Sequence, residues 1–151
     1  MQNDMNLESG VCEMDELGNI TNSISTVYNL IILDESGSMS GVIGQTITGC
    51  NEALNGIRVS ATEDKEQRQF VSIYCFDTTN SRYLIENTPI EKVRDMTSND
   101  YSPNACTPLY DAIGNTVSRL KNIATNSDSI GKVIIITDGY ENASQKWIIL
   151  R

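Results

Sequence analysis

The sequence predicts an α/β fold, in which an open, mostly parallel sheet carries helices on both faces. Three observations predict it. Short β-branched apolar runs alternate with helical periods along the chain, as in strands joined by helical crossovers. Residues 27–33 are almost continuously apolar, as expected of a central strand that is covered on both faces. The length of 151 residues is that of one domain with one core.

The elements follow in chain order. Residues 1–24 are polar and acidic without periodicity, so we expect a flexible acidic lead-in to a domain that spans residues 25–151. Apolar spacings of three and four predict helices over residues 43–57 and 109–123. Pro89 is expected to open a short helix that ends at Met96. Four strands are expected, at residues 27–33, 70–76, 81–86 and 132–137. The second and third of these are expected to pair as a hairpin.

The charge distribution limits the partners. The formal net charge is −9, and no basic residue precedes Arg58. Such a chain lacks the basic patch that binds phosphate, so nucleic acid is not an expected partner. The N-terminus has neither the basic and apolar pattern of a secretory signal nor the arginines of a mitochondrial one. No run approaches the roughly 18 apolar residues of a membrane span. We therefore expect a cytoplasmic protein without membrane insertion.

The absence of histidine excludes Ser-His-Asp and Cys-His catalysis and every histidine-containing metal site. P-loop and serine-hydrolase motifs are also absent, and Ser36 stands where a haloacid-dehalogenase phosphatase needs its second acid. We therefore do not expect an enzyme. The cysteines, of which Cys50 and Cys75 are expected to be buried thiols, form no C-x-x-C pair that would indicate zinc or redox chemistry.

Oxygen-bearing side chains stand where the predicted strands end. Asp34, Ser36 and Ser38 follow the first strand, Asp138 follows the last, and Thr107 precedes the second long helix. Ligands of open α/β sheets bind at the carboxyl ends of the strands, so we expect these five side chains at one sheet edge. Each also has a structural alternative, because aspartates begin turns and hydroxyl residues cap helices.

The order and spacing of these residues resemble the metal-ion-dependent adhesion site of the von Willebrand factor A family. The resemblance covers about residues 27–146 and rests on D-x-S-x-S at 34–38, on residues 107–113, and on Thr-Asp-Gly at 137–139. It implies a Rossmann-like sheet and one bound Mg²⁺, with Mn²⁺ or Ca²⁺ as alternatives. Bacterial relatives often carry glycine where this chain has Ala105 and Cys106.

The resemblance also implies a role for each site residue. The hydroxyls of Ser36 and Ser38 would bind the cation directly, and Thr107 directly or through water. Asp34 and Asp138 would act mainly through water. Hydroxyl, carboxylate and water oxygens suit Mg²⁺ at roughly 2.0–2.1 Å. Because most of these ligands are neutral, the cation would keep a positive charge that favours an incoming carboxylate.

The expected function is therefore metal-dependent protein binding, in which the cation coordinates an Asp or Glu side chain of a partner protein. Glu35, Met39, Tyr140 and Glu141 flank the loops and are expected to form the partner-binding rim. Tyr110 is a further candidate with an equally plausible structural role. The alternative is a regulatory or adaptor subunit that couples a partner ATPase to its target through the same metal site.

Few residues follow Asp138, whereas the resembled fold continues with further strands and helices. Residues 141–146 fit the start of such a helix. We therefore expect a domain that is shortened at its C-terminus, as a natural short form or a fragment, with its fourth strand exposed as a sheet edge. The apolar run at 147–150 is expected to be buried against this sheet or in a homodimer through the C-terminal edge.

Overall fold

The structure is a computed structural model, and it describes residues 13–14, 20–21 and 24–146. The chain forms an α/β fold around a four-stranded mixed sheet with the strand order β5-β4-β3-β6. β3 pairs in parallel with both β4 and β6, and β5 runs antiparallel to β4. The predicted α/β class and mostly parallel sheet are confirmed. The strand bounds are β3 (Ser25–Asp34), β4 (Gln67–Phe76), β5 (Arg82–Pro89) and β6 (Ser129–Ile136).

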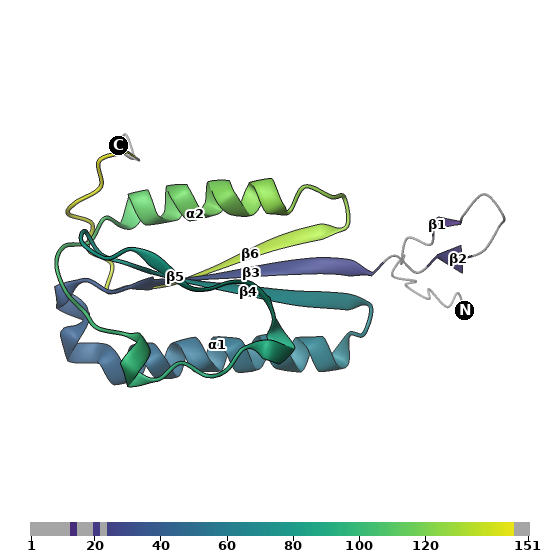
Figure 1. Cartoon of the computed structure of the whole chain (residues 1–151), viewed down its shortest axis with the longest axis horizontal. Helices are drawn as coiled ribbons and strands as arrows, with labels where there is room; N and C mark the ends of the chain where they lie inside the picture. Colours follow the sequence, from purple (N-terminus) through teal and green to yellow (C-terminus); the bar gives the residue numbers. More distant parts are fainter. Residues whose placement is uncertain (1–12, 15–19, 22–23, 147–151) are drawn as a thin grey trace, which may run out of the picture.

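One long helix covers each face of the sheet, α1 (Ile43–Glu63) on one side and α2 (Leu109–Ile123) on the other (Figure 1). A 3-10 helix, η1 (Gly37–Val42), leads into α1. The apolar period of α1 ends at Ile57, yet the helix continues to Glu63. In this last part the Ser60 hydroxyl donates to the Gly56 carbonyl, so a polar residue remains compatible with the helix.

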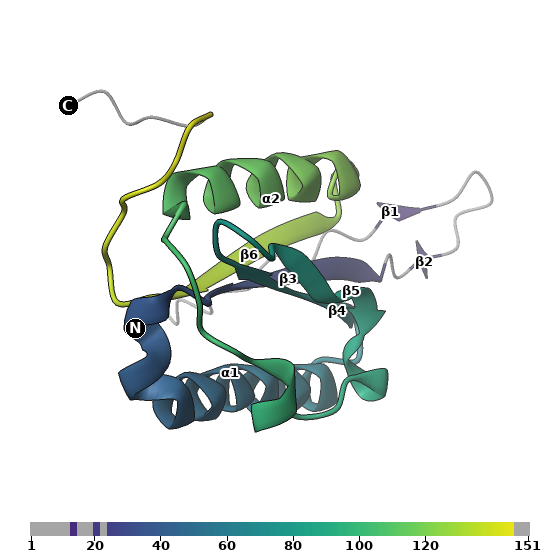
Figure 2. The ribbon, with the colours of Figure 1, turned by 60° about the vertical axis from the view of Figure 1, so that its left-hand side comes forward.

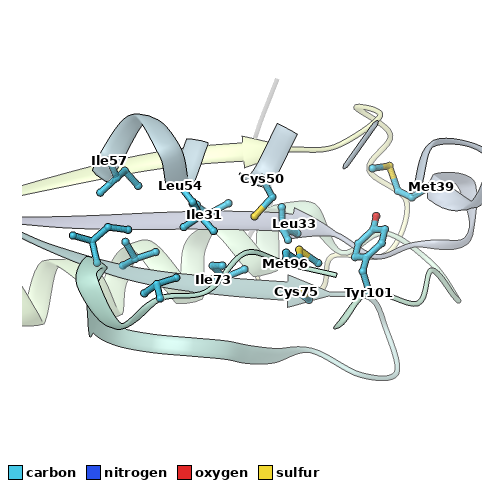
Figure 3. Packing of buried hydrophobic residues seen from close by; sticks show 13 residues of the cluster. Ile31, Leu33, Met39, Cys50, Leu54, Ile57, Ile73, Cys75, Met96 and Tyr101 are labelled. Atoms are coloured by element: carbon cyan, nitrogen blue, oxygen red, sulfur yellow. The ribbon is translucent and has the colours of Figure 1, made fainter. Parts of the chain in front are cut away.

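Two apolar clusters hold the helices to the sheet. Alternate residues of β3 face opposite layers: Ile31 and Leu33 pack in the cluster on the α1 side, and Leu30 and Ile32 pack in the cluster on the α2 side. Figure 3 shows the α1-side cluster, with Met39 and Tyr101 at the end where the parallel strands finish. This two-sided burial explains the almost continuous apolar run in β3.

Cys50 and Cys75 are buried in the α1-side cluster, as the sequence predicted. Burial raises the pKa of the Cys50 thiol to about 11. Burial and, to a smaller extent, the neighbouring Glu35 carboxylate raise the pKa of the Cys75 thiol to about 12. Both thiols are therefore protonated and unreactive at neutral pH.

The predicted helix from Pro89 to Met96 is wrong. Only residues Ile90–Lys92 form a 3-10 turn, η2. Side chains of α1 form hydrogen bonds with the backbone N–H and carbonyl groups that would bond to one another in a helix. Asn51 accepts from the Met96 N–H at 2.8 Å and donates to the Met96 carbonyl at 3.0 Å. Arg58 donates to the Val93 carbonyl at 3.0 Å.

The expected lead-in contains a short antiparallel pair, β1 (Glu13–Met14) and β2 (Ile20–Thr21), which the absence of periodicity did not predict. Among the described residues, β6 is the last strand on its side of the sheet, as predicted. The apolar run at 147–150, which we expected to be buried, lies outside the described residues. Within the described ranges, no helix has the length and apolar character needed to cross a membrane.

Candidate functional site

Asp34 ends β3 and ties together the ends of two neighbouring strands. Its carboxylate is fully buried, and one oxygen accepts from the Ser36 N–H at 2.9 Å. The other accepts from the Thr137 hydroxyl at 2.6 Å. The parallel register pairs Leu33 with Ile136, which brings Thr137 level with Asp34. Because both carboxylate oxygens bond to the protein, Asp34 is suited to orienting the loops and less suited to binding a cation directly.

The hydroxyl oxygens of Ser36 and Ser38 lie 3.2 Å apart. Ser36 is buried, and Ser38 is exposed at the start of η1. Adjacent ligands of an octahedral ion are separated by about 1.4 bond lengths, which is about 2.9 Å for Mg²⁺ and about 3.3–3.7 Å for Ca²⁺. The two hydroxyls are hydrogen-bonded to each other, and their separation lies between these two spacings, so a small shift would make them neighbouring ligands of one divalent cation.

The loop that carries Thr107 is bonded to the D-x-S-x-S loop through the backbone. The Gly37 N–H donates to the Ala105 carbonyl at 3.0 Å, and the Asn104 N–H donates to the Glu35 carbonyl at 2.7 Å. Thr107 itself is only 1% exposed, and it follows closely on this bonded segment. Its hydroxyl is therefore a candidate third ligand.

Ala105 has a φ of +56°, in the left-handed region that favours glycine. It is one of the two positions where the resembled family often carries glycine. The loop thus takes the backbone conformation that a glycine would adopt most easily, although the side chain at this position is a methyl group.

Asp138 lies beyond the end of β6 and is exposed. One of its carboxylate oxygens accepts a long hydrogen bond, 3.4 Å, from the Tyr140 N–H. Its carboxylate is therefore more accessible than that of Asp34, which is fully buried. Asn142, a few residues further on, connects this segment to Thr107: its side-chain oxygen accepts from the Thr107 N–H at 2.8 Å, and its own N–H donates to the Thr107 carbonyl at 3.2 Å.

Residues 141–146 do not form the expected helix; they clasp the first turn of α2 (Figure 2). The Glu141 carboxylate accepts from the Tyr110 N–H at 3.0 Å, and the Ser144 hydroxyl accepts from the Asp111 N–H at 3.0 Å. Asp111 in turn accepts from the N–H groups of Gln145 at 2.8 Å and Lys146 at 2.9 Å. Glu141 and Ser144, which we expected at the start of a helix of their own, thus cap α2 instead. They accept hydrogen bonds from N–H groups in the first turn of α2, which have no partner within that helix.

The hydrogen bonds of this clasp, residues 141–146, also act on Glu141. Burial raises the pKa of its carboxyl group, but hydrogen bonds from Ser144, Tyr110 and Ala143 lower it by more, so the pKa lies below its ordinary value. Glu141 is therefore held as a carboxylate inside the clasp, and both of its oxygens are occupied.

Glu35 and Met39 are not rim residues, contrary to expectation. Glu35 is 1% exposed, and its carboxylate pairs with Arg82 at 2.5 Å. Met39 is 2% exposed and packs in the α1-side cluster because η1 turns it toward the sheet. Tyr140 is 74% exposed and remains available as a rim residue. Arg82 and Asn142 were not predicted as members of this region. Thr137 was part of the Thr-Asp-Gly motif, but no role was predicted for its hydroxyl.

In the described part of the chain, no three carboxylate or thiol groups converge as a metal-binding cluster. The expected site differs in kind, because three of its five members are hydroxyl groups. No protein-family model matches the chain, and none of the curated proteins compared with it is a match.

Proposed function

We propose that the chain is a divalent-cation-dependent protein-binding domain of the von Willebrand factor A type, whose metal site takes an Asp or Glu side chain from a partner protein. The observation that carries the proposal is the pair of hydroxyls of Ser36 and Ser38, which lie 3.2 Å apart next to the buried carboxylate of Asp34. Hydroxyl oxygens suit a hard cation such as Mg²⁺, with Mn²⁺ as a close substitute, and their separation lies between the ligand spacings of Mg²⁺ and Ca²⁺.

Each residue would have a distinct role. Ser36, Ser38 and Thr107 would offer neutral hydroxyl oxygens. Asp34 would hold the Ser36 backbone and the end of β6 in place, because its two oxygens are bonded to Ser36 and Thr137. Asp138 would offer an accessible carboxylate. The bound cation would supply a positive charge with a coordination position open to a carboxylate.

The overall charge of the chain supports a dependence on the cation. With a net charge of −9, the protein repels an acidic partner at long range. A cation held mainly by neutral oxygens would reverse the sign locally. Tyr140, beside Asp138 and 74% exposed, is the rim residue that we expect to contact the partner.

Titration calorimetry with Mg²⁺ and Mn²⁺ tests the metal site. The wild type should bind one cation, and Ser38→Ala should weaken binding by roughly tenfold or more, since even outer-shell partners of metal ligands contribute that much. Ser40→Ala is the matched control, because Ser40 is an exposed serine of the same 3-10 helix. The cation should also raise the melting temperature of the wild type and of Ser40→Ala.

The proposal fails if the wild type binds no cation or if Ser38→Ala binds it as tightly as Ser40→Ala. Partner capture from the native host, with and without EDTA, tests the second half. A partner whose affinity is unchanged by EDTA contradicts cation-mediated binding. Recovery of an ATPase would favour the regulatory alternative, and recovery of a surface or matrix protein would favour adhesion.

A further inference from the structure

Glu35 stands between Asp34 and Ser36, yet its side chain turns into the protein. It is 1% exposed, and its carboxylate accepts from the Ser102 N–H at 2.6 Å. Its backbone is fixed as well, because its N–H donates to the Phe76 carbonyl at 2.9 Å and its carbonyl accepts from the Asn104 N–H at 2.7 Å. Glu35 therefore joins the D-x-S-x-S loop to the end of β4 and to the loop that leads to Thr107.

Arg82, at the start of β5, neutralises this buried carboxylate. Its two terminal nitrogens lie 2.5 Å and 3.3 Å from the two Glu35 oxygens, and one of them also donates to the Asp100 carbonyl at 3.2 Å. The planar guanidinium can bond both carboxylate oxygens and a carbonyl at once, which an ammonium group cannot do with the same geometry. The pair thus connects β5, the D-x-S-x-S loop and the loop after η2.

We propose that Glu35 and Arg82 are positioning residues for the cation site, which fix the loop carrying Thr107 against the loop carrying Ser36 and Ser38. This inference rests on the proposed function. None of the proposed ligands contacts Arg82 directly. The connection runs from Arg82 to Glu35, from Glu35 to Ser102 and Asn104, and along the chain to Thr107.

The pair also controls charge beside the cation. An unpaired buried carboxylate is costly, and one placed next to the metal loops would lower the positive charge that an acidic partner meets. Arg82 offsets that negative charge, so Glu35 takes less of the positive charge of the cation away from an acidic partner.

Hydrogen exchange measured without metal tests the positioning role. In Arg82→Gln, the amides of Gly37, Ser102 and Asn104 should exchange roughly tenfold faster, because their loops open more often, while amides in the middle of α1 should not change. Arg58→Gln is the matched control: Arg58 also pairs with a carboxylate, Asp95 at 2.7 Å, and its side chain has the same 32% exposure as that of Arg82.

Calorimetry with Mn²⁺, at a temperature where every variant is folded, tests the effect on the site. Arg82→Gln should weaken cation binding roughly tenfold to a hundredfold, the range found for outer-shell partners, and Arg58→Gln should leave it unchanged. Arg82→Lys keeps the positive charge but loses the planar group that bonds both Glu35 oxygens, so its affinity for Mn²⁺ should be intermediate. A purely structural role would lower the melting temperature without changing the affinity of the folded protein.

The outcomes separate the two proposals. A wild type that binds no cation refutes the proposed function and this inference together. A wild type that binds Mn²⁺ while Arg82→Gln binds equally tightly refutes this inference alone, as does unchanged exchange of the three loop amides. If Arg82→Gln does not fold, Arg82→Lys decides by the same criteria.

Discussion

The hydroxyl of Thr137 donates to the carboxylate of Asp34 at 2.6 Å, across 103 residues of sequence. This contact joins the ends of β3 and β6 where the candidate ligands gather. Because Asp34 is fully buried, the oxygen that accepts this bond has no access to water if the hydroxyl is removed. The contact therefore matters for the stability of the fold as well as for the order of the site.

Thr137→Val should lower the free energy of unfolding by about 1–3 kcal/mol, the cost of leaving a buried acceptor unpaired. Urea denaturation measures it. Thr116→Val is the control, since the buried Thr116 hydroxyl donates at 2.7 Å to the Ala112 carbonyl of its own helix, a carbonyl that the helix can bond without it. Equal destabilisation in the two variants would contradict the role of the Asp34 contact.

Ala105→Gly should stabilise the protein by about 0.5–1 kcal/mol. At a φ of +56°, alanine is strained by about 1–2 kcal/mol, and glycine removes that strain at the cost of some extra unfolded-state entropy. Ala53→Gly, in the middle of α1, should instead destabilise by about 1 kcal/mol. Thermal or urea unfolding of the two variants gives the signs. A loss of stability in Ala105→Gly would show that this strain is absent.

The Asp100 carboxyl group should make stability depend on pH in the acid range. Hydrogen bonds from Arg94 and then from the Thr97 N–H hold the pKa of Asp100 far below its usual value. Its folded-state pKa is thus below its unfolded one of about 3.9, so its contribution is complete above about pH 5 and is lost as the pH falls below 4. At acid pH, the free energy of unfolding of the wild type should therefore approach that of Asp100→Asn.

Urea midpoints from pH 7 to pH 2.5 test this. The difference between wild type and Asp100→Asn should be largest at neutral pH and should shrink as the pH falls. Asp100 ends a 3-10 turn, η3 (Ser98–Asp100), and Ser98→Ala, an exposed change in this turn, should run parallel to the wild type. A difference between wild type and Asp100→Asn that stays constant across the range would show that the pKa is not shifted by folding.

The edge of β6 should mediate self-association. Ile130, Val133 and Ile135 are 46%, 40% and 41% exposed along a strand that ends the sheet, and such edges pair with other strands. Val133→Lys should therefore reduce the apparent mass in light scattering. Val59→Lys is the control, because Val59 is 45% exposed on α1, away from the edge.

A chain that ends at Lys146 extends this test to the apolar run at 147–150. If that run contributes to the interface, its removal should lower the apparent mass together with the melting temperature. A monomeric wild type whose stability is the same with and without these residues would refute burial of the run in a dimer.

The sequence predicted those elements whose side chains follow one period. β3 is recognisable because both of its faces are buried, and α2 because one face is. The prediction failed where side chains from a distant part of the sequence form hydrogen bonds with the backbone. Asn51 and Arg58 hold residues 93–96 in a non-helical path, and no local pattern near Pro89 signals this.

The candidate site shows the same limit. Strand ends located Asp34, Ser36, Ser38 and Asp138 at one edge of the sheet, because parallel strands finish together. Neighbouring positions were harder to assign. Because Glu35 lies in a loop, we expected it to be exposed. It is buried because its carboxylate pairs with Arg82, which lies 47 residues away in the sequence. Such pairs depend on tertiary structure and leave no periodic trace.

The clasp at residues 141–146 determines when the site can be completed during synthesis. α2 leaves the ribosome before the residues that cap its first turn, and the backbone of Thr107 waits for Asn142, 35 residues later. β6 lies between them in the chain, and its pairing with β3 places the residues that follow it beside α2. The contacts of the Thr107 loop with Glu35 and Gly37 need no residue beyond Ala105, whereas the contacts of Thr107 with Asn142 can form only after residues 137–142 have been made.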